Sequence, residues 1–166
     1  MKEMELLWKK KLLFSGVFVQ ENRLHAILDR NLNGITTKQW LLLVVSSSLS
    51  NPPDLTTLGK ILGCSRQNIK KLALSLEKEG FIKLTPSYCD KRSLWVSILD
   101  KGKTIIEDSK EMEDKVYGSL FRDFSEEDIS EYFKLSEKFS KGIGYLEECF
   151  ISLKSTVYKG LHRVGI

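Results

Sequence analysis

A short segment near the middle of the chain concentrates side chains that can hydrogen-bond to the polar edges of planar groups. One hydroxyl, one guanidinium, two amides and two ammonium groups occur at Ser65, Arg66, Gln67, Asn68, Lys70 and Lys71. A guanidinium can bond O6 and N7 of guanine together, and an amide can bond N6 and N7 of adenine. Ammonium groups neutralise phosphates. The chemistry that these residue types predict is contact with double-stranded DNA.

An α-helix is the element predicted to carry this set. Steps of three and four residues, typical of the buried face of a helix, separate Ile69, Leu72 and Leu76. Ser65 is an N-cap residue type, and Gly80 suits a left-handed C-terminal cap. We therefore expect a helix over residues 65–79. Its polar residues lie near its N-terminus, which is the half of a recognition helix that enters the major groove.

A shorter helix and a turn are predicted directly before it. Thr56 and Thr57 are N-cap residue types, and they precede a compact set of apolar residues. Gly63 follows where a left-handed cap would end such a helix. The sequence thus predicts a helix, a turn and a second helix in close succession.

Two strands joined by a charged loop are predicted next. Residues 81–85 and 93–98 are rich in β-branched and aromatic side chains, as strands are. The connection carries Asp90, Lys91 and Arg92, so it can project cations beyond the body of the domain. A guanidinium there can enter the narrow minor groove beside the major groove that holds the helix. We expect Asp90 to hold Arg92 in place through a bidentate ion pair.

The pattern from residue 35 to residue 102 resembles the DNA-binding core of the MarR (multiple antibiotic resistance regulator) family. The matching segments are residues 35–45, 55–62, 65–69, 76–82, 90–92 and 101–102. The resemblance implies a mainly α-helical homodimer with one winged domain per subunit, which usually represses transcription and is released by a small ligand or by oxidation. It also implies that residues 65–71 form the recognition segment and that Asp90 and Arg92 belong to the wing motif.

Apolar stripes at the two ends of the chain predict a partner for each end. Near the carboxyl end, steps of three and four separate Ile129, Tyr132, Ser136, Phe139, Ile143, Leu146, Phe150, Leu153 and Val157. A broader stripe near the amino end comprises Leu6, Leu13, Phe14, Val17, Phe18, Leu24, Ile27 and Leu28. One small winged domain cannot cover such stripes, so we expect the ends to interlock across a two-fold axis. The alternative is packing within a monomer.

Caps and glycines predict where the remaining helices begin and break. We expect Asp100 to cap a helix over residues 100–118, because Leu99 stands where the family commonly has a capping threonine. Ser125 is the expected N-cap of the carboxyl-terminal helix. Gly142 and Gly144 each weaken a helix by about 1 kcal/mol relative to alanine, so we expect a kink or break near them.

Length and composition fit a mainly α-helical chain with one winged domain and helical arms. The chain has 166 residues and is 42% hydrophobic, so we expect one domain with a core, or a small domain plus helical arms, in preference to two independent globular domains. We assign residues 1–34 to an N-terminal dimerisation helix and residues 35–102 to a winged helix-turn-helix with a small antiparallel β-wing. Residues 103–166 are assigned to a linker helix and C-terminal dimerisation helices.

The charge is distributed as a DNA-binding protein requires. Residues 54–102 hold nine Lys and Arg against five Asp and Glu, whereas residues 103–166 hold ten against thirteen. Excess positive charge is the sign expected where phosphates are neutralised, although an ordinary solvated surface is the alternative. The sequence shows neither an export signal nor a membrane span, so we expect a cytoplasmic protein without a membrane partner.

The aromatic, cysteine and histidine residues are candidates for other chemistry. Phe14, Phe18 and Trp40 are candidates for an effector pocket, the alternative being that they are core or interface residues. Cys64 precedes a helix N-terminus and Cys89 lies beside two cations, settings that favour a reactive thiolate and hence redox sensing; the alternative makes Cys64 a packed turn residue. His25 and His162 have no ligand cluster, so we expect no metal and no cofactor.

The function predicted from the sequence is sequence-specific regulation of transcription by a homodimer. The dimer would bind a pseudo-palindromic operator, repress transcription, and be released by a small ligand or oxidation. No nucleophile, general base or phosphate-binding glycine loop is recognisable, so we expect no enzymatic activity. The alternative function is a winged-helix module that binds protein and not specific DNA, for which Tyr88 speaks.

Overall fold

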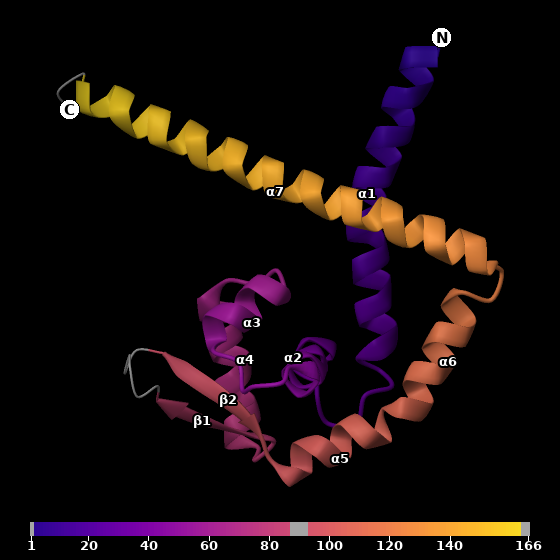
Figure 1. The fold of residues 1–166 in the computed structure, drawn as a ribbon, viewed down its shortest axis with the longest axis vertical. Coiled ribbons are helices and arrows are strands. Elements are labelled where there is room, and N and C mark those ends of the chain that lie inside the picture. Colours follow the sequence, from indigo (N-terminus) through magenta and orange to yellow (C-terminus); the bar gives the residue numbers. More distant parts are fainter. Residues whose placement is uncertain (1, 87–92, 164–166) are drawn as a thin grey trace. The chain divides into compact units, whose positions relative to one another are not determined.

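The chain is mainly α-helical, with a two-stranded antiparallel sheet, as predicted. The computed structural model describes residues 2–86 and 93–163, with side chains up to residue 152. Its elements are α1 (Lys2–Leu28), α2 (Thr37–Ser48), α3 (Leu55–Ile61), α4 (Arg66–Lys78), β1 (Ile82–Pro86), β2 (Leu94–Ile98), α5 (Asp100–Asp108), α6 (Lys110–Leu120) and α7 (Glu126–Arg163) (Figure 1).

Internal contacts divide the chain into two compact units, Met1–Asp114 and Lys115–Ile166. This division differs from the predicted boundaries at residues 34 and 102, because it keeps α1 and α5 with the sheet. The predicted boundaries describe function and stay a prediction. Within the first unit, α2, α3, α4, the sheet and α5 form what we call the winged core.

The winged core is built around apolar residues from α2, α3, α4 and both strands, and α5 packs against them with the partly buried Ile105 and Ile106. The apolar residues less than a tenth exposed are Ile35, Trp40, Leu42, Leu43, Leu55, Leu58, Ile69, Ala73, Leu76, Phe81, Ile82 and Val96. The predicted buried face of α4 is confirmed at Ile69 and Leu76, which are fully buried, and Leu72 between them is partly buried against the core. Removing such side chains from water is the main source of stability for a domain of this size.

A dense set of hydrogen bonds begins α2. The Thr36 hydroxyl accepts from the Gln39 N–H at 3.3 Å, and Gln39 Oε1 accepts from the Thr36 N–H at 2.8 Å, which makes a capping box. Asp29, which follows α1, accepts from both the N–H and the hydroxyl of Thr37. These hydrogen bonds hold the pKa of Asp29 below its usual value. Side-chain acceptors thus fix where the central helix of the winged core starts.

The N-cap of α3 corrects the sequence-based expectation. Asp54, and neither Thr56 nor Thr57, caps this helix by accepting a hydrogen bond from the Thr57 N–H at 2.7 Å. A carboxylate at this position also interacts favourably with the helix dipole. Gly63 (φ 61°) and Gly80 (φ 78°) adopt the left-handed conformation predicted for the ends of α3 and α4.

The two strands pair in a simple hairpin register. Ile82 lies opposite Ile98, and Leu84 lies opposite Val96. The predicted strands are confirmed with small shifts at their ends: Pro86 is part of β1, although it was expected in the connection. Pro86 lacks an N–H, and a strand end tolerates that loss.

The helix expected over residues 100–118 is two helices. Ser109 ends α5, and α6 begins at Lys110. The Ser109 hydroxyl donates to the Ile106 carbonyl and accepts from Trp40 Nε1 at 2.9 Å. Asp100 does not cap α5, because its carboxylate pairs with Lys103 at 2.8 Å and the N-cap Leu99 makes no side-chain hydrogen bond.

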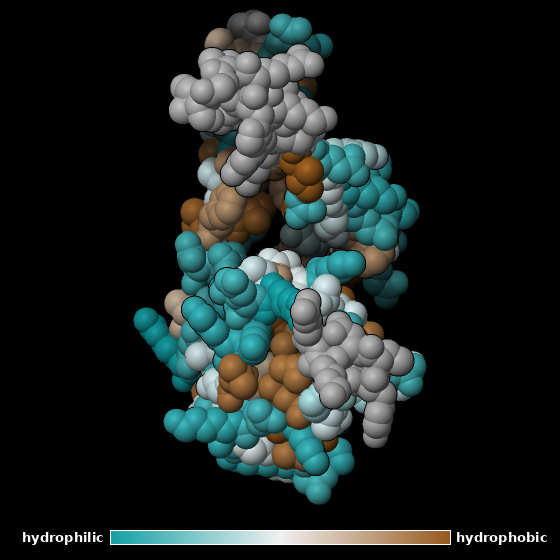
Figure 2. Space-filling model, turned by 90° about the vertical axis from the view of Figure 1, so that its left-hand side faces the viewer, coloured by the Kyte–Doolittle hydropathy of each residue, from teal (hydrophilic) through white to brown (hydrophobic). Residues whose placement is uncertain are grey.

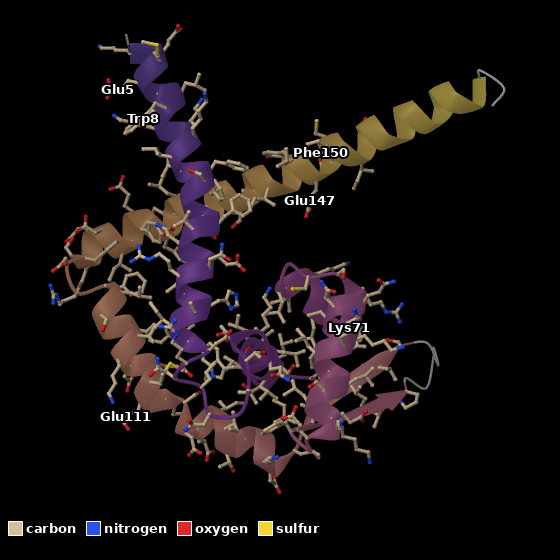
Figure 3. The ribbon with its side chains drawn as sticks, turned by 180° about the vertical axis from the view of Figure 1, so that it is seen from behind. Glu5, Trp8, Lys71, Glu111, Glu147 and Phe150 are labelled. Atoms are coloured by element: carbon tan, nitrogen blue, oxygen red, sulfur yellow. The ribbon has the colours of Figure 1, made fainter. Side chains whose placement is uncertain are left out.

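The terminal helices are long and their apolar residues are exposed. α7 begins as predicted, because Ser125 accepts from the Asp128 N–H at 3.1 Å. The expected break near Gly142 and Gly144 is wrong, since α7 continues through both glycines. Figure 3 shows Trp8 on α1 and Phe150 on α7, and both side chains are more than half exposed.

Candidate nucleic-acid interface

The predicted polar set lies on α4. This helix follows Ser65, whose hydroxyl oxygen accepts from the Asn68 N–H at 3.2 Å and leaves the hydroxyl hydrogen able to donate elsewhere. All six predicted residues of this segment are exposed, whereas Ile69 between them is fully buried. Figure 3 labels one of them, Lys71, on α4. The structure thus brings these residues together at one accessible helix end.

α4 has one side in the winged core and one side open. At 3.6 residues per turn, the side opposite Ile69 and Leu76 carries Gln67, Lys70, Lys71, Leu74 and Lys78. All five are exposed, and we call them the reading face. Arg66 and Asn68 lie at its two margins. The predictions from sequence omitted Leu74, although its spacing of seven residues from Gln67 places both on one line of the helix.

The electrostatics of this helix end favour an anion. The unpaired backbone N–H groups give a helix N-terminus a partial positive charge, and phosphates bind at such ends. Arg66, Lys70 and Lys71 add cationic side chains within the first two turns. The pKa of the neighbouring Asp54 carboxyl is lowered, first by the hydrogen bond from the Thr57 N–H and also by the charge of Arg66.

A tight turn joins α3 to α4. A Cβ atom on Gly59 would lie 2.8 Å from the carbonyl oxygen of Cys64, so only glycine fits there without a shift. The Cys64 N–H donates to the Gly59 carbonyl at 2.9 Å. This contact fixes α3 against the start of α4, and α4 is therefore presented at a defined angle.

A buried amide connects α2 to α4. Gln39, 7% exposed, donates from Nε2 to the Ser75 hydroxyl at 3.1 Å, and that hydroxyl donates to Glu79 Oε1 at 3.1 Å. The same Gln39 closes the capping box of α2 through its Oε1. One side chain therefore ties the start of α2 to the middle of α4.

A carboxylate connects α4 to the sheet. Glu77 Oε1 accepts a hydrogen bond from the backbone N–H of Leu84 in β1 at 2.7 Å. β2 pairs with the other edge of β1, so Glu77 occupies a donor on the edge that has no strand partner. The strands and α4 are thus held together by a polar contact besides their shared apolar core.

The end of α4 is docked on the start of α5. A Cβ atom on Gly102 would lie 2.4 Å from the Phe81 carbonyl oxygen, so the two segments touch at backbone distance. Lys101 donates to the Glu79 carbonyl at 2.8 Å and lies 4.3 Å from the Phe81 ring centroid. Lys101 and Gly102, which belong to the pattern that resembles the family, thus have a structural role in this packing.

The predicted wing tip lies outside the described residues. The predicted tip residues are Cys89, Asp90, Lys91 and Arg92. The base of the wing is described: the Val96 N–H donates to the Pro53 carbonyl at 2.9 Å, and Trp95 forms a bridge with Asp54. The base is therefore anchored on the segment that caps α3, and the roles of the tip residues stay predictions.

The three aromatic candidates for an effector pocket have different surroundings. Phe14 and Phe18 are exposed on α1 and contact each other edge to face, with ring centroids 5.3 Å apart. Trp40 is 7% exposed within the winged core, and its indole N–H is bonded to Ser109. The structure brings the two phenylalanines together but not Trp40, and the effector pocket stays a prediction.

The cysteines and histidines form no shared site among the described residues. Cys64 is partly buried against the core, which is consistent with the alternative that it is a packed turn residue. Cys149 is exposed on α7. His25 lies 3.3 Å from Glu21 on the same helix. Residues 2–86 and 93–152 contain no trio of His, Cys, Asp or Glu side chains placed to hold a metal. No helix in the described part is long and apolar enough to cross a bilayer.

Comparison with known proteins identifies the fold. No family model matches the chain. Over 123 residues it is 29% identical to the transcriptional activatory protein BadR of Rhodopseudomonas palustris, a match covering 71% of this chain and 70% of that protein. A MarR protein from Peptoclostridium difficile has a similar structure, with a TM-score of 0.74, 22% identity, and coverage of 80% of this chain and 87% of that one.

A third similar protein has been solved in complex with DNA. Sco3205 of Streptomyces coelicolor, a MarR family transcriptional regulator solved bound to DNA, has a TM-score of 0.72 and 19% identity, covering 81% of this chain and 87% of that one. The chain therefore has the fold of the MarR-family transcriptional regulators.

Proposed function

We propose that the protein is a MarR-type regulator that binds a specific double-stranded DNA sequence and represses transcription. The observation that carries this proposal is the division of α4: Ile69, Ala73 and Leu76 on one side are fully buried, while exposed amide and cationic side chains occupy its N-terminal half. That arrangement suits base edges and phosphates at once. Similarity to the transcriptional activatory protein BadR and to the DNA-bound Sco3205 supports regulation of transcription through DNA, and repression is what the family resemblance implies.

The proposed active form is a homodimer. All the large apolar residues of the α7 stripe from Ile129 to Phe150 are exposed in the single chain, as are Leu6, Leu13, Phe14, Val17 and Phe18 on α1. Exposed stripes of this length are normally covered by a partner. A two-fold dimer would place two copies of α4 about 10 base pairs apart on a pseudo-palindromic operator.

Release from DNA is proposed to follow a small ligand or oxidation, as the family resemblance implies. A ligand that binds better to a dimer with altered spacing of the two α4 helices would lower the affinity for DNA. For oxidation, Cys64 is the described candidate, since it lies in the turn before α4. Replacing Cys64 by serine would abolish a response to peroxide but would leave a response to ligand intact.

The rival function is protein binding by the same surface. An aliphatic residue on the reading face, Leu74, and the exposed Ile61 on α3 are the described features that favour it. Three lysines surround Leu74 on that face. Charged residues are depleted in the cores of protein–protein interfaces. The cationic set therefore favours DNA over a protein partner.

Binding to selected DNA tests the proposal. Purified protein would select sites from random duplexes, and the affinity for the selected site would be compared with that for unrelated DNA by fluorescence anisotropy at fixed salt. Gln67→Ala should weaken specific binding by about 1–3 kcal/mol and relax the sequence preference at one position. Lys71→Ala should weaken binding to all sequences and reduce the salt slope by about one.

Lys141→Ala is the matched control, because it removes the same charge from an exposed position of α7. It should leave affinity and specificity unchanged. A wild-type protein that enriches no sequence would refute sequence-specific binding. If a site is selected, a reporter gene fused to it would distinguish repression from activation. Increased expression in the presence of the protein would contradict the proposed repression.

A further inference from the structure

Leu74 is an apolar residue at the centre of a polar, cationic helix face. Its side chain is 46% exposed, and it lies one turn after Lys70 and Lys71 and one turn before Lys78. Figure 2 shows that exposed hydrophobic residues are interspersed among hydrophilic ones on this side of the molecule. Leu74 is therefore not one of the residues that form the buried core, and its side chain is available for contact from outside.

The position of Leu74 on the helix lies in line with Gln67. Seven residues make nearly two full turns, so the two side chains point in almost the same direction about 10 Å apart along the axis. That distance corresponds to roughly three base pairs along a strand. If Gln67 faces base edges in the major groove, Leu74 points toward the same groove from two turns further along α4.

The major groove offers one apolar group to a leucine, the C5-methyl of thymine. Cytosine and both purines lack it, and apolar contact with this methyl is an established means of sequence discrimination. The three lysines around Leu74 would meet phosphates on either side, which a protein partner does not supply. The chemistry of the neighbours thus selects DNA as the occupant.

We propose that Leu74 is a specificity-determining residue that recognises thymine through its C5-methyl group. This inference rests on the proposed function, because it assigns one contact within sequence-specific binding. Leu74 would favour a T·A pair over a C·G pair at the position it faces. The preference would arise from burial of apolar surface and not from hydrogen bonding.

Deoxyuridine provides a direct test, because it differs from thymidine only in lacking that methyl group. In a duplex selected by the wild-type protein, the thymines of each half-site would be replaced one at a time by deoxyuridine, and dissociation constants measured at fixed salt. At one position, wild-type affinity should fall about fourfold, the effect expected for one buried methyl group. Leu74→Ala should bind the thymine and uracil duplexes equally.

Two controls separate the contact from general damage. Leu74→Met keeps an apolar side chain of similar size and should retain the preference for thymine. Ile61→Ala truncates another half-exposed aliphatic residue, on α3 and outside the reading face, and should also retain it. Circular dichroism and the affinity for unrelated DNA should be the same for all variants, since Leu74 is not a core residue.

The outcomes distinguish this inference from the proposed function. Specific binding by wild-type protein with no penalty for uracil at any position would overturn the role of Leu74 and leave the regulator intact. The same conclusion follows if Leu74→Ala keeps the full uracil penalty, because another residue then contacts the methyl. Failure of wild-type protein to select any sequence would instead remove the proposed function itself.

Discussion

Single side chains fix where the two helices of the helix-turn-helix begin. Asp54 accepts from the Thr57 N–H at 2.7 Å, and Ser65 accepts from the Asn68 N–H at 3.2 Å. Such acceptors satisfy N–H groups that have no partner inside the helix. The two caps differ in one respect: Asp54 is ionisable, so its contribution to stability depends on pH.

Replacing Asp54 by alanine should lower the free energy of unfolding by about 1 kcal/mol, the usual cost of losing an N-cap. The hydrogen bond from the Thr57 N–H lowers the pKa of this carboxyl in the folded protein. Its stabilisation is therefore fully present above the unfolded-state pKa, near 3.8, and is lost as pH falls through the lower folded-state value. Urea denaturation at neutral and acidic pH would measure both effects.

Thr56→Ala is the control for this prediction. Thr56 is an exposed cap-type residue two positions further on, and Asp54 is the observed N-cap. The control should change stability by less than the Asp54 variant at neutral pH. Equal effects of both substitutions, or an Asp54 effect that grows as the pH falls, would contradict the assigned cap.

At the scale of elements, α4 is held from two sides by polar contacts. Gln39 reaches it from α2 through Ser75, and Glu77 connects it to β1 through the Leu84 N–H. Hydrogen bonds have narrow geometric requirements, whereas apolar packing alone tolerates small rotations of a helix. The two contacts therefore orient the reading face relative to the base of the wing.

Glu77→Ala should loosen β1 from α4. The Leu84 N–H would lose its carboxylate acceptor, and stability should fall by about 1.5–3 kcal/mol, the range for hydrogen bonds to charged groups. Amide hydrogen exchange measured by NMR should accelerate at Leu84. Glu77→Gln is the matched control, because it keeps an oxygen acceptor; exchange at Leu84 should then stay closer to wild type. Unchanged exchange in the alanine variant would show that this contact does not hold the strand.

Local patterns predicted the elements well, but not the contacts between them. The spacing of Ile69 and Leu76 predicted the buried side of α4, and glycines predicted the C-terminal ends of α3 and α4. These signals could be recognised because they depend only on neighbours in the chain. The bond from Gln39 to Ser75 joins residues 36 positions apart. No local periodicity encodes such a pairing, and Leu74 was missed because exposure is a tertiary property.

Two errors have the same physical origin, a competition between local preference and surroundings. A continuous helix was expected after the sheet, but Ser109 bonds to Trp40, 69 residues earlier, where α5 ends. A break was expected at Gly142 and Gly144, but two glycines cost only about 2 kcal/mol in total, and a 38-residue helix is long enough to continue through them.

At the scale of the whole molecule, the long terminal helices carry the exposed apolar residues on which the proposed dimer rests. α1 has 27 residues and none is buried, and α7 has 38 residues. Helices of this kind are stabilised mainly by packing of their apolar faces, so a lone chain leaves most of that free energy unrealised. A second copy offers the same stripes in a self-complementary arrangement.

Phe139→Glu should therefore convert the proposed dimer to a monomer. Phe139 lies in the middle of the α7 stripe and is 45% exposed in the single chain, so a charge there should disturb the interface without unfolding the winged core. Sedimentation velocity at micromolar concentration should show the change in mass. Because each monomer holds only one α4, affinity for a two-half-site duplex should fall by on the order of 10² or more.

Lys141→Glu introduces the same side chain on the opposite side of α7 and should leave both the mass and the DNA affinity unchanged. A single half-site duplex sharpens the comparison, because it needs only one subunit: Phe139→Glu should bind it as wild type does. A Phe139→Glu protein that remains a dimer would show that the α7 stripe is not the interface. A monomer that keeps full affinity for the two-half-site duplex would instead show that pairing of subunits is not needed to bind DNA.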